Sequence, residues 1–190
     1  MDTTHRSSTG LTLELSRVSP GDAARVGVKA ANQASLLQAG FPVPDGVVLT
    51  ADAHASFIGA GSITGDGAPA SLSPGVRHLL AEVMTILGDT PVAVRSSGIA
   101  EDLPDASFAG QYETVLGVEG LDELGEAVRH TWMSAASTHA TKYRESRGLR
   151  EASMAVLIQR MVDAEAAGVA FSANPVTGSR REVIINAVPG

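Results

Sequence analysis

The chain of 190 residues contains no cysteine, so neither a disulfide nor a thiolate metal site can form within it. Aromatic residues make up only 4%, so the core must be built from Val, Leu, Ile, Ala and Met. Positive charge is also in deficit, and the formal net charge is -7. That balance argues against unaided binding to DNA or RNA, which needs surplus Lys and Arg. A small polyphosphate is not excluded, because a few well-placed cations suffice for it.

Long apolar runs are missing as well. No run approaches the roughly 18 residues that a membrane span needs, and the first ten residues lack the apolar centre of a signal peptide. We therefore expect a cytoplasmic protein with neither a nucleic acid nor a membrane as partner. The hydrophobic content of 44% and the charged content of 18% are typical of a globular domain. The length suits one large domain or two small lobes.

The apolar patterning predicts a mixed α/β protein with a β-rich last third. Residues 1–10 are polar, and we expect them to be disordered. The clearest helix is 76–87, where apolar residues recur at helical spacing along one stripe. Predicted strands are 11–15, 46–50, 91–94, 113–118, 154–161, 168–173 and 182–187; predicted helices are 29–38, 51–58, 76–87 and a tract from 121 to about 147. Gly40 is expected to close the first helix.

The most informative stretch is 92–114. A predicted buried strand ends in Arg95, and a long polar loop with Gly110 near its end follows. A cation there suits a phosphate site, because ligands of open α/β sheets bind beyond the carboxyl ends of strands and long loops tend to be functional. The residues alone leave a second interpretation open, in which Arg95 pairs with Glu101 or Asp102 and the loop is a surface excursion.

Lys29 stands at the start of the predicted helix 29–38. A lysine opposes the helix dipole there, and its position makes sense if the lysine and the helix N-terminus together receive a phosphate. A solvated lysine, tolerated at small cost, is the alternative.

Three further residues have two interpretations each. Gly110 would let the backbone approach a phosphate and the Thr114 hydroxyl would donate to one, or the two simply form a turn into the next strand. Gln159 lies within an apolar strand, where it could contact an adenine edge or point to solvent by alternation. Other motifs are weak: there is no phosphate-binding P-loop sequence, and the five histidines show no local metal spacing.

The run VRSSGIAEDLPDASFAGQYET (94–114) resembles the VRSSA-x-x-EDLP-x-ASFAGQ-x-ET segment of the phosphoenolpyruvate synthase and pyruvate phosphate dikinase family, which the rifampicin phosphotransferases share. The run KAANQASLLQAGFPVPDG (29–46) is similar to the family's opening GGK segment, and GVAFSANPVTG (168–178) to a later one. The likeness extends over about 11–187. One departure is Val28, which replaces the second glycine of GGK and would crowd the nucleotide or tilt the loop.

The resemblance implies an ATP-grasp fold, with 11–190 as the N-terminal portion of its ATP-binding domain. It further implies that Lys29 and Arg95 grip the phosphates of ATP. Gly110 and Thr114 would belong to the glycine-rich loop that covers those phosphates, and Gln159 would contact adenine or ribose. The segment 168–178 would be scaffold without a catalytic role.

In intact members of the family, ATP donates its β-phosphate to a histidine, which passes it to pyruvate or a drug hydroxyl. The resemblance places that histidine, and the later Glu and Gln-x-Arg elements that hold Mg2+ and phosphates, in parts that this sequence does not contain. We therefore assign no catalytic and no metal-ligating residue here. ATP and Mg2+ are the expected cofactors, with the metal ligands supplied from outside this chain.

The expected function is the ATP-binding portion of a phosphoenolpyruvate synthase-like phosphotransferase. Its expected partners are ATP and a separate chain or further domains that carry the rest of the lobe and the histidine. Two alternatives remain: a non-catalytic module that senses nucleotide or binds a partner, and a degenerate remnant. The sequence does not identify the phosphate acceptor.

Overall fold

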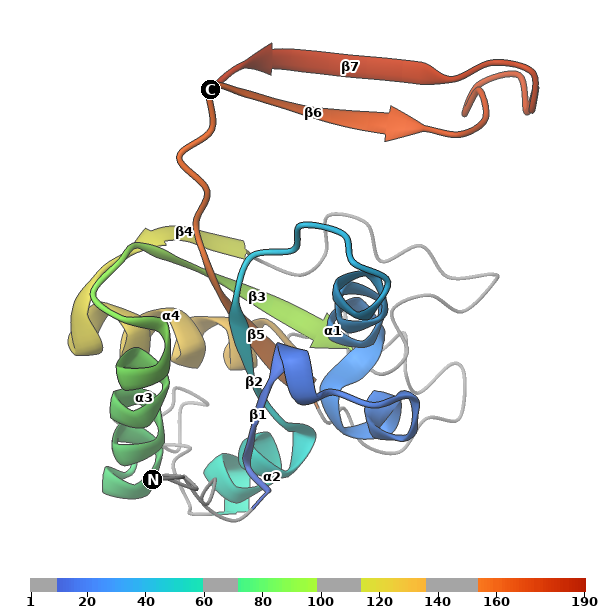
Figure 1. Ribbon diagram of the computed structural model, residues 1–190. Helices are drawn as coiled ribbons and strands as arrows, with labels where there is room; N and C mark the ends of the chain where they lie inside the picture. The colour runs from blue at the N-terminus through green and yellow to red at the C-terminus, as the bar shows by residue number, and fades with distance from the viewer. Residues whose placement is uncertain (1–9, 60–71, 99–113, 136–153) are drawn as a thin grey trace, which may run out of the picture.

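The computed structural model describes residues 10–59, 72–98, 114–135 and 154–190 (Figure 1). Its strands are β1 (Thr12–Glu14), β2 (Gly46–Leu49), β3 (Val92–Gly98), β4 (Thr114–Val118), β5 (Met154–Arg160), β6 (Ala166–Phe171) and β7 (Ile184–Pro189). Its α-helices are α1 (Ala23–Gln38), α2 (Ala51–Gly59), α3 (Pro74–Leu87) and α4 (Gly120–Ala135), with short 3-10 turns η1 (Leu15–Arg17) and η2 (Pro20–Asp22). The α/β class and the β-rich last third are confirmed.

Five strands form one sheet in the order β1-β2-β5-β3-β4, and every neighbouring pair is antiparallel. The strands at the centre are thus far apart in the sequence. The rule that ligands bind beyond the carboxyl ends of strands applies to parallel sheets, so it does not apply to this antiparallel sheet. In this sheet, a site is identified by the face on which its side chains lie and not by the ends of the strands.

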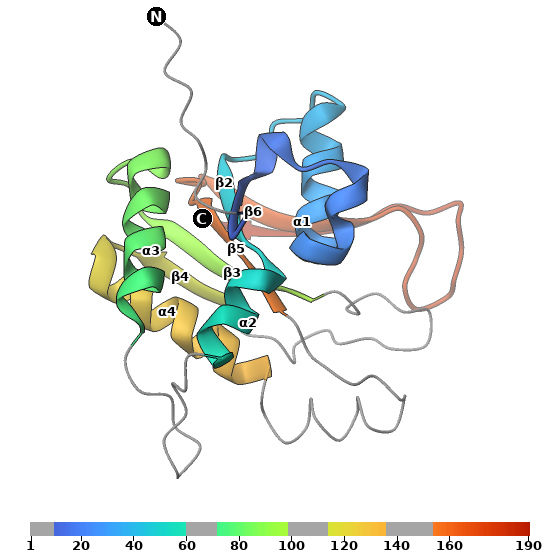
Figure 2. The ribbon, with the colours of Figure 1, turned by 90° about the horizontal axis from the view of Figure 1, so that it is seen from below.

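Helices cover both faces of the sheet (Figures 1 and 2). One core cluster joins α2, α3 and α4 to side chains such as Val47, Val156 and Ile158. The other joins α1 to the alternate side chains, among them Val48 and Leu157. Burial on both faces explains why β2 and β5 are continuous apolar runs in the sequence.

β3 is longer than predicted. The sequence suggested that the strand stops at 94 and a loop follows Arg95, but the strand continues to Gly98 and Arg95 lies at its middle. Ser96 and Ser97 stay in the ladder because they pair with Val156 and Ala155 of the buried strand β5. Pairing with a distant strand overrides the local preference of serine for loops.

α1 begins at Ala23, six residues before the predicted start at 29. However, the helix is broken at Gly27, two residues before that predicted start. Gly27 has φ 77° and ψ 165°, which separates a short first turn from the segment that contains Lys29. At the other end, Gly40 has φ 85° and its N–H donates to the carbonyl of Leu37 at 3.0 Å, so the predicted cap is confirmed.

β6 and β7 form a separate two-stranded hairpin that extends away from the sheet (Figure 1). Its strands and the turn around Asn174 agree with the sequence-based expectation. Every residue of both strands is exposed. No helix within the described ranges has the length and apolarity needed to cross a membrane.

Candidate functional site

The predicted site residues that the structure describes gather on one face of the sheet. Arg95 on β3 pairs with Thr114 on β4, and Gln159 on β5 pairs with Ala93, two residues before Arg95. Because side chains alternate along a strand, these three point to the same face. It is the face that α1 covers, and α1 carries Lys29. Gly110 lies outside the described residues.

Lys29 is attached to β3 directly beside Arg95. Its Nζ donates to the backbone carbonyl of Ser96 at 2.8 Å, and its side chain is half-buried. The break at Gly27 is what brings this lysine over the strand, since it redirects the chain one turn earlier. The lysine of α1 is thus bonded to the residue that follows Arg95 on β3, although the two elements are far apart in the sequence.

Arg95 has an unusual environment for an arginine. The residue is half-buried, and its Nε is buried without a hydrogen-bond partner among the described residues. By contrast, Nε of Arg160 donates to the carbonyl of Leu87 at 2.7 Å, and Nε of Arg129 donates to Glu126. A buried donor without an acceptor costs about 1–3 kcal/mol. An anion placed over this face would supply the missing acceptor.

Gln159 does not point to solvent, so that alternative is wrong. The side chain is 6% exposed, and its Nε2 donates to Oε1 of Gln33 at 2.7 Å and to the carbonyl of Pro44 at 2.9 Å. Both contacts lie on the α1 face, and Gln33 is one helical turn after Lys29. The amide nitrogen is therefore engaged within the protein.

Two apolar residues beside these polar ones were not singled out from the sequence. Leu116 is 64% exposed and lies two residues after Thr114, and Met161 follows β5 and is 40% exposed. The Met161 sulfur accepts from the N–H of Gly117 at 2.9 Å, so Leu116 and Met161 lie close together. The alternation of β4 was a usable signal, because it places Leu116 on the face of Thr114.

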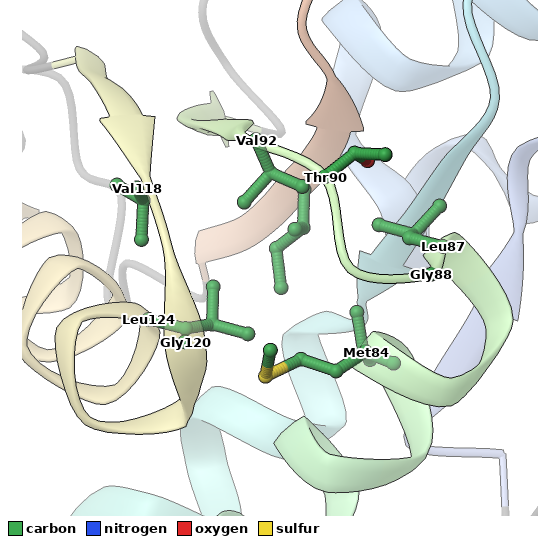
Figure 3. Close-up of a pocket in the computed structure, with 10 residues that line it drawn as sticks. Met84, Leu87, Gly88, Thr90, Val92, Val118, Gly120 and Leu124 are labelled. Carbon is green, nitrogen blue, oxygen red and sulfur yellow. The ribbon is translucent and has the colours of Figure 1, made fainter.

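Other places in the structure are poorer candidates. Figure 3 shows a cavity between α3, α4 and the sheet whose lining is almost wholly apolar, including Met84, Leu87, Val118 and Leu124. It offers no charge to a ligand and fits a gap in core packing. In the described ranges no group of three His, Asp or Glu residues is placed to hold a metal ion.

The chain matches, over residues 61–190, the family described as the pyruvate phosphate dikinase AMP/ATP-binding domain. It is 34% identical to the phosphoenolpyruvate synthase of Aeropyrum pernix, over 87% of this chain and 24% of that protein. A probable phosphoenolpyruvate synthase of Archaeoglobus fulgidus is 36% identical over 94% of this chain and 28% of its own length. The prodigiosin synthesizing transferase PigC of Serratia marcescens is 36% identical over 95% and 22%.

The chain therefore spans about a quarter of the length of these relatives. The family resemblance drawn from the sequence motifs is confirmed, both by the matched domain and by relatives aligned along most of the chain. The chain belongs to the pyruvate phosphate dikinase AMP/ATP-binding domain family.

Proposed function

We propose that this chain binds ATP on the α1 face of its sheet, as the ATP-binding portion of a phosphoenolpyruvate synthase-like phosphotransferase. The observation that carries the proposal is the buried Nε of Arg95, which has no partner among the described residues, one residue before the Ser96 carbonyl that Lys29 binds. Family membership supplies the class of ligand, since the matched domain is one that binds AMP or ATP.

Lys29 and Arg95 take the phosphate end of the nucleotide. A guanidinium offers parallel N–H donors that match phosphate oxygens in pairs, and an ammonium acts as a compact charge beside it. In a chain with a net charge of -7, such local pairing of cations is what an anionic ligand needs. Thr114 stands opposite Arg95 in the ladder, where its hydroxyl can donate to the same phosphates. Gly110 lies outside the described residues, and its role in covering the phosphates stays a prediction from the family resemblance.

The adenine end lies further along the sheet. Gln159 is two residues beyond Leu157, the partner of Arg95, which corresponds to roughly 7 Å along a strand. There the amide oxygen of Gln159 can accept from the exocyclic amine of adenine. Leu116 and Met161 add exposed apolar surface on which a flat base can pack.

The family resemblance supports an ATP-grasp clamp in which this chain forms one side. Mg2+ would enter with ATP, and its ligands would come from outside the described residues. The phosphorylated histidine and the acceptor site would likewise come from further domains or a separate chain, so phosphoryl transfer is expected of the intact enzyme only. The cysteine-free composition is compatible with a reducing, cytoplasmic setting. A non-catalytic nucleotide sensor would use the same residues and differ only in lacking transfer.

Calorimetric titration with ATP, with and without Mg2+, tests the proposal. We expect saturable binding by the unmodified chain. Arg95→Ala and Lys29→Ala should each weaken it by about 1–3 kcal/mol, the scale of a lost charge-assisted hydrogen bond. Arg77→Ala is the matched control, because Arg77 is exposed on α3 and pairs with Asp122, away from the α1 face.

Unchanged affinity in folded Arg95→Ala protein would contradict the role of Arg95. An equal loss in Arg77→Ala would mean that overall charge, not this site, governs binding. A folded chain that binds no ATP would contradict the proposal for this chain alone.

A further inference from the structure

Ser97 joins the end of β3 to the break in α1, and its contacts with Gly27 and Ala30 are called the Ser97 lock below. The Ser97 hydroxyl accepts from the backbone N–H of Ala30 at 3.0 Å, and the residue is 0% exposed. A Cβ added to Gly27 would lie 2.1 Å from the Ser97 carbonyl oxygen and 2.5 Å from its Oγ. The two backbones therefore approach one another as closely as a glycine permits.

The hydrogen bond between Ser97 and Ala30 satisfies a backbone N–H group that the break at Gly27 leaves without a partner in the helix. The helical segment after Gly27 starts anew, and the first N–H groups of a helix have no partner within it. Normally the capping residue's own side chain accepts from the third residue of the helix. Gly27 has no side chain, and Ala30 is that third residue. Ser97, 67 residues later in the chain, supplies the acceptor instead.

The Ser97 lock lies next to the two residues of the proposed phosphate site, Lys29 and Arg95. Ser96, directly before Ser97, accepts from Nζ of Lys29 through its carbonyl, and Arg95 precedes Ser96 on the same strand. The helical segment that carries Lys29 and the strand that carries Arg95 are thus joined at two consecutive residues. Loss of the Ser97 bond would free the helix start to move relative to Arg95.

We propose that Ser97 is a positioning residue of the phosphate site: its hydroxyl caps the second segment of α1 and thereby sets Lys29 against Arg95. The proposal rests on the proposed function for its ligand. Ser97 does not touch the nucleotide, because it is buried beneath α1 with its oxygen bound to the Ala30 N–H. It acts through Lys29.

A double-mutant comparison of ATP affinity tests this role, with Ser97→Ala made both in the unmodified chain and in Lys29→Ala. In the unmodified chain we expect about a tenfold loss of affinity, the scale of one lost buried hydrogen bond. In the Lys29→Ala background the same change should cost less than about twofold, because the side chain that Ser97 positions is gone. Thr131→Val is the control, since it removes a buried hydroxyl from α4 on the other face.

An equal loss with and without Lys29, or a loss no larger than that in Thr131→Val, would overturn the proposal. Hydrogen exchange of the Ala30 amide separates this failure from failure of the proposed function. Faster exchange of Ala30 in Ser97→Ala, with β5 amides unchanged, supports the lock whether or not ATP binds. Unchanged exchange refutes the lock. If the lock is present but the unmodified chain binds no ATP, the proposed ligand is wrong and the positioning role toward it falls as well.

Discussion

At the level of single residues, Arg95 is the side chain on which the proposed ATP site most depends. Its buried Nε lacks a partner among the described residues, and that deficit lowers the stability of the ligand-free protein. Buried groups of this kind are retained where a ligand satisfies them. Arg160 offers the comparison, because it too is half-buried but donates to Leu87 and pairs with Asp45.

We predict that Arg95→Met raises the free energy of unfolding by about 1 kcal/mol while it weakens ATP binding, because it removes an unsatisfied buried donor. Arg160→Met should lower the free energy of unfolding instead. Urea denaturation of the two variants measures both changes. A clear destabilisation by Arg95→Met would contradict the account, since it would mean that the guanidinium is already satisfied without a ligand.

Asp22 provides a pH-dependent prediction away from the site. Hydrogen bonds from the hydroxyl and then the backbone N–H of Ser19, together with the charge of Arg25, lower the pKa of its carboxyl below the ordinary 3.8. A lowered pKa stabilises the fold above the unfolded-state pKa, and this contribution is lost as the pH falls through the folded-state value.

Asp22→Ala should therefore lower the free energy of unfolding by about 1 kcal/mol at neutral pH, because the hydrogen bonds from Ser19 in the capping box of η2 are lost. The difference between the variant and the unmodified chain should shrink as the pH falls below 3.8. Denaturant titrations at neutral and acid pH measure it. A difference that stays constant across that range would show that the carboxylate charge contributes nothing.

The residue types at the site were predictable, but their surroundings were not. Lys29, Arg95 and Gln159 stand out in the sequence because each is polar or charged in an otherwise apolar setting. That Gln159 is held by Gln33, and that Ser97 caps a helix 67 residues earlier, depends on contacts between distant segments. No local pattern encodes such contacts.

At the scale of elements, the break at Gly27 determines where the lysine lies. Its backbone angles are ones that essentially only glycine adopts, and its missing side chain makes room for the Ser97 carbonyl. Gly40 also has a positive φ, but nothing lies within 4 Å of an added Cβ. A substitution at Gly40 therefore reports backbone strain alone, whereas one at Gly27 reports backbone strain and steric clash together.

Gly27→Ala should lower the free energy of unfolding by about 3 kcal/mol or more, because overpacking adds to the strain of a left-handed backbone. Gly40→Ala should cost about 1–2 kcal/mol from the backbone alone. Unfolding free energies of both variants check this. If the two variants lose equal free energy of unfolding, α1 and β3 do not approach one another closely enough at Gly27 for an added methyl group to clash.

Helices and strands with a clear period were predictable at this scale. The stripe of α3 and the apolar run of β5 needed no knowledge of neighbours. The extension of β3 through Ser96 and Ser97 was not predictable, because it follows from pairing with β5. The antiparallel order of the sheet was equally hidden, since it joins strands far apart in the sequence.

At the scale of the whole molecule, the hairpin β6–β7 differs from the rest. Its apolar residues, including Phe171, Ile184 and Val188, remain exposed, and an isolated two-stranded hairpin is only marginally stable in water. We predict that its amides exchange with solvent far faster than those of β3 and β5. Hydrogen exchange at two protein concentrations measures this. Strong protection at both would contradict the exposed arrangement; protection only at the higher one would show association through the hairpin.

We have proposed that ATP binds on the α1 face, between Lys29 and Gln159. Mapping of backbone amide chemical shifts during an ATP titration tests it most directly, since a protein of 19.5 kDa is well suited to this method. We predict that the largest shifts fall on the start of the second α1 segment, on β3 around Arg95 and on the beginning of β4, while α3 stays unchanged. Shifts confined to α3 and α4, or none at all in the folded chain, would contradict it.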